Sequence, residues 1–142
     1  MDLWKYQNNE IPITINILTD YYKDEKTKII GLTGSQGSGK STISKIIKII
    51  LKEGFGLKTL IFSIDDFYKT LKERQLMSQK VSPLFLVRGV PGTHDTRLLN
   101  QCLRKLKSLY FKKFIIPRFD KSTDDRSPKS KWQKISEKPN IV

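Results

Sequence analysis

The chain has 142 residues, enough for one domain with a hydrophobic core but few for an enzyme with a nucleotide site and a second substrate site. Its 27 Lys and Arg residues exceed its 14 Asp and Glu residues, but they are mostly spread singly, which argues against nucleic-acid binding. The single cysteine, Cys102, excludes an intrachain disulfide, and without a leader or an 18-residue apolar stretch we expect a cytoplasmic protein with no membrane contact.

The first 27 residues do not predict one type of secondary structure. Ile13, Ile15 and Ile17 alternate with polar residues as in a strand, but they can equally form the apolar side of a helix. Leu3, Trp4, Tyr21 and Tyr22 are expected to cover one face of a sheet. We therefore expect residues 1–27 to be a helical or irregular segment that packs on a domain formed by residues 28–142.

An apolar run leads directly into a glycine-rich turn and then into a helix. Residues 28–33 have the consecutive apolar residues of a strand that is covered on both faces. Residues 34–42 read Gly-Ser-Gln-Gly-Ser-Gly-Lys-Ser-Thr and match the phosphate-loop pattern G-x-x-x-x-G-K-[ST]. The helix that follows has one apolar face, formed by Ile43, Ile46, Ile47 and Ile50, and it can end at Gly54 or Gly56.

This loop predicts a site for a nucleoside triphosphate with Mg²⁺. Its glycines let backbone N–H groups surround phosphate oxygens at the positive end of the helix dipole. Lys40 can reach the β- and γ-phosphates, and the hydroxyl of Ser41 can bind Mg²⁺. The expected nucleotide-binding residues are Gly34, Ser35, Gln36, Gly37, Ser38, Gly39, Lys40, Ser41 and Thr42.

A second apolar run, residues 59–64, predicts a strand parallel to the first and joined to it by a right-handed crossover. Asp65 and Asp66 follow the carboxyl end of this expected strand, which is the edge of the sheet where α/β proteins bind their ligands. Asp65 can orient Mg²⁺ or accept a proton from an attacking hydroxyl. Asp66 either contributes to the same site or caps a helix that begins near Phe67. These features predict an α/β fold with the parallel sheet and flanking helices of P-loop NTPases.

The second half of the chain alternates helices with polar stretches. Residues 70–79 predict an exposed helix, residues 81–90 an irregular loop, and residues 114–116 a short strand. A helix capped by Asp95 should run to about Tyr110, with an apolar face formed by Leu98, Leu99, Cys102, Leu103, Leu106 and Leu109. His94, just before it, is either a surface group or a site residue. Residues 121–139 predict an exposed polar loop.

Four stretches together resemble the P-loop D-glycerate 3-kinases, which are related to uridine kinases, phosphoribulokinases and bacterial pantothenate kinases. They are residues 34–42, 63–68, 88–95 and 117–122, which occur in the order and spacing of that family. The resemblance implies an enzyme that transfers the γ-phosphoryl group of ATP to a hydroxyl, most directly that of D-glycerate. The alternatives are a uridine kinase-like or pantothenate kinase-like enzyme, or a nucleotide-binding fragment without turnover.

The resemblance also implies roles for individual residues. Lys40 would stabilise charge on the transferred group, Asp65 would be the base or metal-orienting acid, and Ser41 and Asp65 would hold Mg²⁺. The pocket for the small-molecule acceptor would be lined by Asp66, Tyr68, Arg88, His94, Arg118 and Lys121.

The family pattern continues past the present sequence. In the family, a strand ending in Glu-Gly-Trp follows the polar loop, lies between the strands at 28–33 and 59–64, and is followed by a lid. Here the sequence stops at Asn-Ile-Val, so the resemblance implies a C-terminally truncated domain. We therefore expect residues 1–142 alone to bind Mg·ATP weakly and to have little or no kinase activity.

Overall fold

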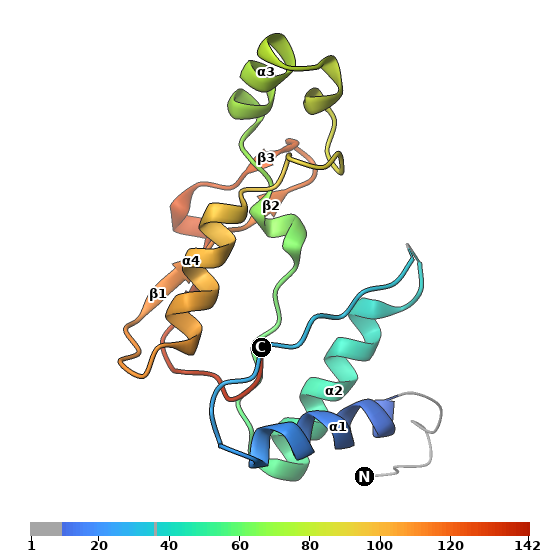
Figure 1. Cartoon of the computed structure of the whole chain (residues 1–142), viewed down its shortest axis with the longest axis vertical. Helices are drawn as coiled ribbons and strands as arrows, with labels where there is room; N and C mark the ends of the chain where they lie inside the picture. The colour runs from blue at the N-terminus through green and yellow to red at the C-terminus, as the bar shows by residue number, and fades with distance from the viewer. Residues whose placement is uncertain (1–9, 36) are drawn as a thin grey trace. The chain divides into compact units, whose positions relative to one another are not determined.

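The structure, a computed structural model, describes residues 10–35 and 37–142 and divides the chain into two compact units. The first unit extends to Ile61 and also contains Lys138–Val142, and the second unit is Phe62–Glu137. Helices α1 (Glu10–Tyr22) and α2 (Lys40–Phe55) belong to the first unit, and the other labelled elements of Figure 1 belong to the second. The chain therefore leaves the first unit, forms the second, and returns.

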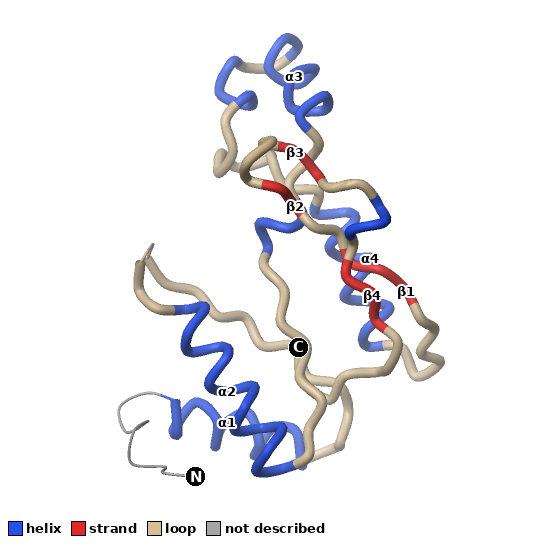
Figure 2. The backbone as a smooth tube through the Cα atoms, turned by 180° about the vertical axis from the view of Figure 1, so that it is seen from behind, coloured by secondary structure: helices blue, strands red, loops and turns tan. Residues whose placement is uncertain are grey.

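The first unit is held together by the packing of α1 against α2, which lie side by side in Figures 1 and 2. Its buried core contains Ile17, Tyr21, Ile47, Leu51, Leu57 and Ile141. The isoleucines at 13, 15 and 17 are therefore part of a helix, on which Ile17 is buried and Ile15 is 55% exposed. Of the four residues expected on a sheet face, Tyr21 is in this core and Tyr22 is exposed, while Leu3 and Trp4 lie outside the described residues.

The apolar runs on either side of α2 are extended but are not full strands. Lys28 and Thr59 each form a parallel bridge to Ile141, so the end of the chain lies between the two runs. The Lys28 N–H donates to Asn140 O at 3.0 Å, and the Leu60 N–H donates to Ile141 O at 2.9 Å. The expected strands at 28–33 and 59–64 are thus too long, because residues 140–142 pair with only part of each run and Ile64 already belongs to the turn η2 (Ile64–Phe67). The runs are parallel, but they pair through this segment rather than with each other.

The second unit contains η2 (Ile64–Phe67), α3 (Leu71–Lys80), η3 (Pro83–Leu86) and α4 (Thr96–Lys107). Both expected helices are present, and the Asp95 side chain caps α4 by accepting from the Leu98 N–H at 3.0 Å. α4 buries Cys102 and Leu106 but ends before Tyr110. The expected place of Leu109 on its apolar face is wrong, because the chain leaves the helix at Ser108 and Leu109 is 77% exposed.

Two short antiparallel pairs complete the second unit (Figure 2). β1 (Phe114–Ile116) pairs with β4 (Gln133–Ile135), and β2 (Phe119–Asp120) pairs with β3 (Asp125–Arg126). Residues 121–139, expected as a polar loop, therefore contain β3, η4 (Lys129–Lys131) and β4. Polar side chains hold this region in place, as when Asp125 accepts from the Leu71 N–H at 2.8 Å.

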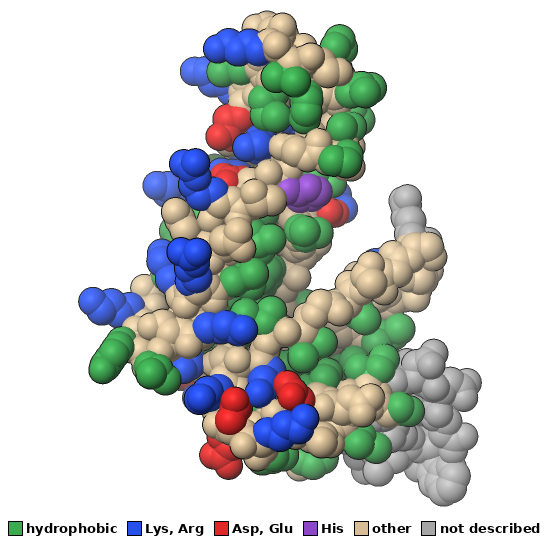
Figure 3. Space-filling view, in the orientation of Figure 1, with side chains coloured by type: hydrophobic (Ala, Val, Ile, Leu, Met, Phe, Trp, Pro, Cys, Tyr) green, Lys and Arg blue, Asp and Glu red, His purple; other side chains and the backbone are tan. Residues whose placement is uncertain are grey.

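Basic side chains are distributed over several elements on the face shown in Figure 3, with polar and apolar groups between them. In the part of the chain that the structure describes, no helix has the length and apolar character needed to cross a membrane.

Candidate active site

The phosphate loop leads into the first turn of α2. Gly37 and Gly39 have φ angles of 79° and 78°, in the left-handed region that favours glycine. A Cβ atom on Gly34 would lie 2.9 Å from Ser38 Oγ, so a larger residue there would require the Ser38 side chain to move. Gln36 lies outside the described residues. The loop thus places its backbone at the N-terminal end of α2, where unpaired N–H groups and the helix dipole favour an anion.

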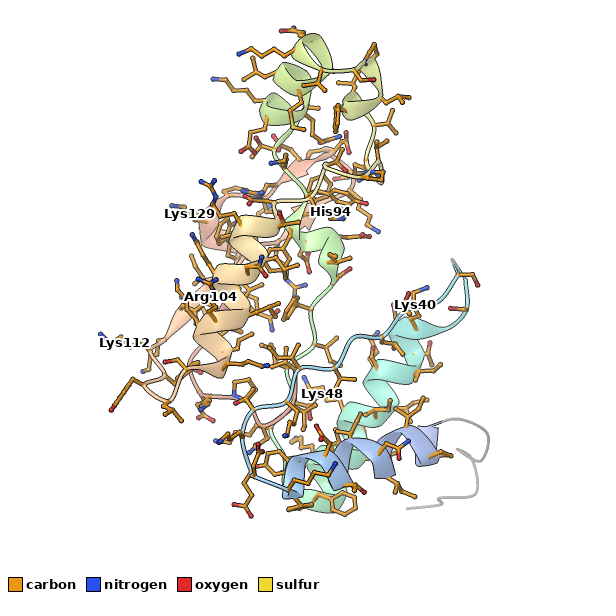
Figure 4. All side chains as sticks on the ribbon, viewed as in Figure 1. Lys40, Lys48, His94, Arg104, Lys112 and Lys129 are labelled. Atoms are coloured by element: carbon orange, nitrogen blue, oxygen red, sulfur yellow. The ribbon has the colours of Figure 1, made fainter. Side chains whose placement is uncertain are left out.

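The side chain of Lys40 folds back across this loop from the start of α2 (Figure 4). Its ammonium donates to Gly34 O at 2.7 Å, to Ser35 O, and to Ser38 Oγ at 3.4 Å. All three acceptors are neutral. Phosphate oxygens form stronger, charge-assisted bonds with an ammonium, so a bound triphosphate can replace these partners.

The oxygen ligands expected for Mg²⁺ are available on exposed or partly exposed side chains. The Ser41 side chain is exposed in the first turn of α2, and Asp65, in the second unit, keeps 36% of its side chain exposed. Within residues 10–35 and 37–142, no three His, Cys, Asp or Glu residues gather as a metal site. Mg²⁺ bound with a nucleotide takes most of its ligands from phosphates and water, so the single hydroxyl of Ser41 suits that role within the first unit.

Asp65 and Asp66 lie together in η2 but differ in their contacts. The turn begins with a capping box, in which the Asp65 N–H donates to Ser63 Oγ and the Ser63 N–H donates to Asp66 Oδ2 at 3.3 Å. Asp66 therefore caps the turn that contains it, rather than a helix that begins near Phe67. The carboxylate of Asp65 instead lies 3.0 Å from the ammonium of Lys121, which is largely exposed.

Asp66 and Arg118, both expected to line the acceptor pocket, are bonded to each other. Asp66 Oδ2 lies 3.1 Å from Arg118 Nη1, and Asp66 Oδ1 accepts from the Phe119 N–H at 3.2 Å. The second Nη group of Arg118 donates to Gln133 Oε1 at 2.9 Å. This network joins η2, β2 and β4, so the atoms expected to contact an acceptor have structural partners.

Tyr68 and His94 form the centre of a second cluster. Their rings stack with centroids 4.1 Å apart, and the two residues form an antiparallel bridge. Burial, together with the negative charge of Asp65, raises the pKa of the Tyr68 hydroxyl. Burial lowers the pKa of His94, so the neutral imidazole predominates at pH 7, and its Nε2 atom is buried without a hydrogen-bond partner.

Arg88 joins this cluster through the ring of Phe119, which packs edge-on against Tyr68 at 5.3 Å. The Arg88 guanidinium lies over the same ring, 5.4 Å from its centroid, and its Nε atom is 3.1 Å from Asp124 Oδ1. The second unit thus brings together five of the expected residues: Asp65, Tyr68, Arg88, His94 and Lys121. Arg88 and Lys121 are close enough for their charges to counteract the rise in the pKa of Tyr68.

Sequence reasoning missed the arginines that hold this cluster. Arg126 donates to the Tyr68 carbonyl from Nη2 at 2.7 Å and from Nε at 3.2 Å, and its Nη2 also lies 3.3 Å from Asp95 Oδ2. Arg74 is fully buried and contacts Asp124. The only signal in the sequence was the Asp-Asp-Arg stretch at 124–126, within a segment whose polar composition predicts a loop.

Comparison with known proteins identifies the family. The model of the phosphoribulokinase / uridine kinase family matches residues 29–142. The chain belongs to this family. Its members are kinases with the P-loop type of α/β fold, so the fold class and family expected from the sequence are confirmed.

Relatives from fungi and plants agree with this assignment. An uncharacterized kinase of Schizosaccharomyces pombe, mug58, is 35% identical over 116 residues, which cover 78% of this chain and 42% of the relative. The chloroplastic D-glycerate 3-kinase of Arabidopsis thaliana is 31% identical over 123 residues, 80% of this chain and 26% of the relative. The structure of D-glycerate 3-kinase from Cryptococcus neoformans var. grubii superimposes with a TM-score of 0.83 at 28% identity, over 95% of this chain and 50% of that one. The chain therefore spans half or less of each of these proteins.

Proposed function

We propose that the protein is an ATP-dependent kinase that phosphorylates a hydroxyl group of D-glycerate. The observation that supports this acceptor is the cluster around Tyr68, where a carboxylate, an ammonium and a guanidinium lie within one unit. In it, Arg88 Nη1 and His94 Nε2 are both buried without a partner. A small hydroxy acid offers a carboxylate for the guanidinium and hydroxyls for the neutral imidazole, and so it would satisfy both groups.

The phosphate loop would hold the triphosphate through its backbone N–H groups and the N-terminal end of α2. Lys40 would exchange its contacts with Gly34, Ser35 and Ser38 for the β- and γ-phosphate oxygens. Ser41 and Asp65 would supply oxygen ligands to Mg²⁺, which neutralises charge on the phosphates when it is bound.

In the transfer step, the acceptor hydroxyl oxygen bonds to the γ-phosphorus, and the bond from that phosphorus to the bridging oxygen of ADP breaks. Asp65 would accept the proton of the hydroxyl, since its carboxylate is the partly exposed one of the Asp65–Asp66 pair. Lys121, 3.0 Å from that carboxylate, would balance its charge. Arg88 would bind the carboxylate of the acceptor and so fix which hydroxyl faces Asp65.

An ADP-release assay over D-glycerate, uridine, pantothenate and ribulose 5-phosphate tests this function. In the full-length protein, we expect D-glycerate to give the highest turnover and Asp65→Asn to remove it, whereas the matched change Asp120→Asn, outside the cluster, should not. Stimulation by uridine alone would show that the acceptor is wrong. Binding of Mg·ATP without turnover on any acceptor would instead support a nucleotide-binding fragment.

A further inference from the structure

The ion pairs of the second unit differ in the number of cations that each carboxylate contacts. Three of its ion pairs join one carboxylate to one cation: Asp65 to Lys121, Asp66 to Arg118, and Asp95 to Arg126. The carboxylate of Asp124 instead contacts two arginines, with Oδ2 2.9 Å from Arg74 Nη2 and Oδ1 3.1 Å from Arg88 Nε. Two guanidinium groups that share one carboxylate leave one positive charge uncompensated.

Arg74 cannot offer this charge to a ligand. Its side chain is 0% exposed, and it donates from Nη1 to Leu86 O at 2.8 Å and from Nη2 to both the backbone and the side chain of Asp124. Its Nε atom lacks a partner but lies inside a fully enclosed side chain. Arg74 therefore anchors Asp124, whose backbone has the left-handed φ of 53°. Asp tolerates that conformation better than most residues do.

Arg88 can offer the surplus charge. It keeps 32% of its side chain exposed, its guanidinium lies over the ring of Phe119, and its Nε lies 3.1 Å from Asp124 Oδ1 in an ion pair that is not a hydrogen bond. Its Nη1 is buried and has no hydrogen-bond partner. Arg118 differs, because both of its Nη groups are bonded, to Asp66 and Gln133. The ring of Phe119 and the ion pair with Asp124 together limit the orientation of this guanidinium, and a planar guanidinium can bind a carboxylate through two parallel bonds.

We propose that Asp124, anchored by Arg74, is a positioning residue that orients Arg88 to bind the carboxylate of the acceptor. This assignment rests on the proposed function and makes it more specific, since selectivity for acids then depends on Asp124 and Arg88 rather than on Arg118.

The variant Asp124→Asn in the full chain tests the assignment. Asn also tolerates the left-handed backbone, but its amide has one oxygen where the carboxylate serves two guanidinium groups. We expect the KM for D-glycerate to rise about 10-fold to 100-fold, because a bond to a charged group is weakened, with kcat and the KM for ATP changed little. Turnover of glycerol, which lacks the carboxylate, should not fall. Asp120→Asn, the matched change in the same hairpin, should leave every constant as in the wild type.

Direct binding gives a second readout that does not depend on turnover. His94 is the only histidine, so in the untagged protein its imidazole proton resonances report on the cluster without assignment of other residues. Titration with D-glycerate should shift these resonances in the wild type. In Asp124→Asn and in Arg88→Lys, the same shift should require a D-glycerate concentration about 10-fold higher or more. Arg88→Lys keeps the positive charge but not the planar guanidinium. It is the variant to titrate with D-glycerate if Asp124→Asn does not fold.

The outcomes separate the two proposals. If the wild type phosphorylates D-glycerate and Asp124→Asn keeps its KM and its preference over glycerol, the role of Asp124 is overturned while the kinase assignment stands. An equal loss for D-glycerate and glycerol would also overturn it, because the effect would then not concern the carboxylate. If the wild type uses only neutral acceptors such as uridine, both proposals fail.

Discussion

The two candidate subsites are built in different ways. In the phosphate loop the contacts are local, as in the bond from Lys40 to the carbonyl of Gly34, six positions earlier. In the acceptor cluster the contacts join distant segments, as in the bonds from Arg126 to Tyr68 over 58 positions and from Phe119 to Asp66 over 53. The geometry of the loop follows from backbone conformation, whereas the geometry of the cluster follows from ion pairs between separate segments.

Because the two subsites are built differently, we expect substitutions in them to have different effects on activity and on stability. A side chain in an exposed, locally bonded loop can be removed without uncovering the core, so its loss should affect chemistry more than folding. A charged group that ties three segments together leaves buried partners unsatisfied when it is removed, so its loss should affect both.

The largest effect is expected at Lys40. Lys40→Ala should reduce kcat about 100-fold to 1,000-fold, because the charge on the transferred group loses its main cationic partner. ATP affinity should fall much less, since backbone N–H groups hold the phosphates, and the melting temperature should not change. Steady-state kinetics and a thermal melt measure this, with Lys45→Ala on the exposed face of α2 as the control. A normal kcat would remove Lys40 from its role.

A substitution at Arg126 should lower the stability of the protein and leave nucleotide binding unchanged. Arg126→Lys loses the two bonds to the Tyr68 carbonyl and weakens the contact with Asp95, so the free energy of unfolding should fall by about 1–3 kcal/mol. Mg·ATP affinity should not change. Urea denaturation and calorimetric titration measure the two quantities, and Arg97→Lys, which is exposed on α4, is the control. Equal stability of the two variants would mean that Arg126 does not hold the cluster.

Two glycines of the first unit test the backbone of the loop. Gly39→Ala places a Cβ at a φ of 78° and should cost about 1–2 kcal/mol, with weaker Mg·ATP binding because the loop is displaced. Gly54→Ala, within α2, meets no atom within 4 Å and should stabilise the protein by about 0.5–1 kcal/mol. Thermal melts of the two variants measure these effects. If both substitutions change the melting temperature in the same direction, the left-handed conformation of Gly39 does not have the expected cost.

The smallest effect is the pH dependence contributed by His94. Its pKa in the folded protein lies below the ordinary value of 6.5 because of burial, so the unfolded chain binds a proton more readily. The contribution of the neutral His94 side chain to the free energy of unfolding is fully present above pH 6.5. It is lost as the pH falls through the pKa of the folded state. Proton NMR should give an imidazole midpoint below 6.5, and unfolding of His94→Gln should depend less on pH in this range. A midpoint at or above 6.5 would contradict the burial of the ring.

The glycine-rich turn at 34–39 and the helices α2, α3 and α4 could be predicted because their signals are local, whereas the sequence left α1 undecided. The pattern at 34–42 fixes the order of glycines and Lys40, and the spacing of Ile47 and Ile50 fixes the buried face of α2. The cap at Asp95 follows from a single residue type before an amphipathic helix. Each of these features is decided by neighbours in the chain.

The charge pairing of the cluster could not be predicted from one sequence. Nothing in the residue types at 65, 66, 118 and 121 says which carboxylate takes which cation, and the fold pairs Asp65 with Lys121 and Asp66 with Arg118. The burial of Arg74 is equally hidden, since a lone arginine in a polar helix predicts an exposed side chain. Only tertiary structure brings Asp124 to it.

The return of the chain to the first unit has a consequence for the speed of folding. Thr27 Oγ1 bonds to Pro139 O over 112 positions, and Asn140 Nδ2 bonds to the Tyr21 hydroxyl over 119. Closing so long a loop is slow. Helices α1 and α2 can therefore form early, whereas their contacts with residues 140–142 form only after those residues have been synthesised. During translation the apolar runs at 28–33 and 59–64 therefore lack residues 140–142 as backbone partners until the second unit has been synthesised, and unpaired apolar segments of this kind favour aggregation.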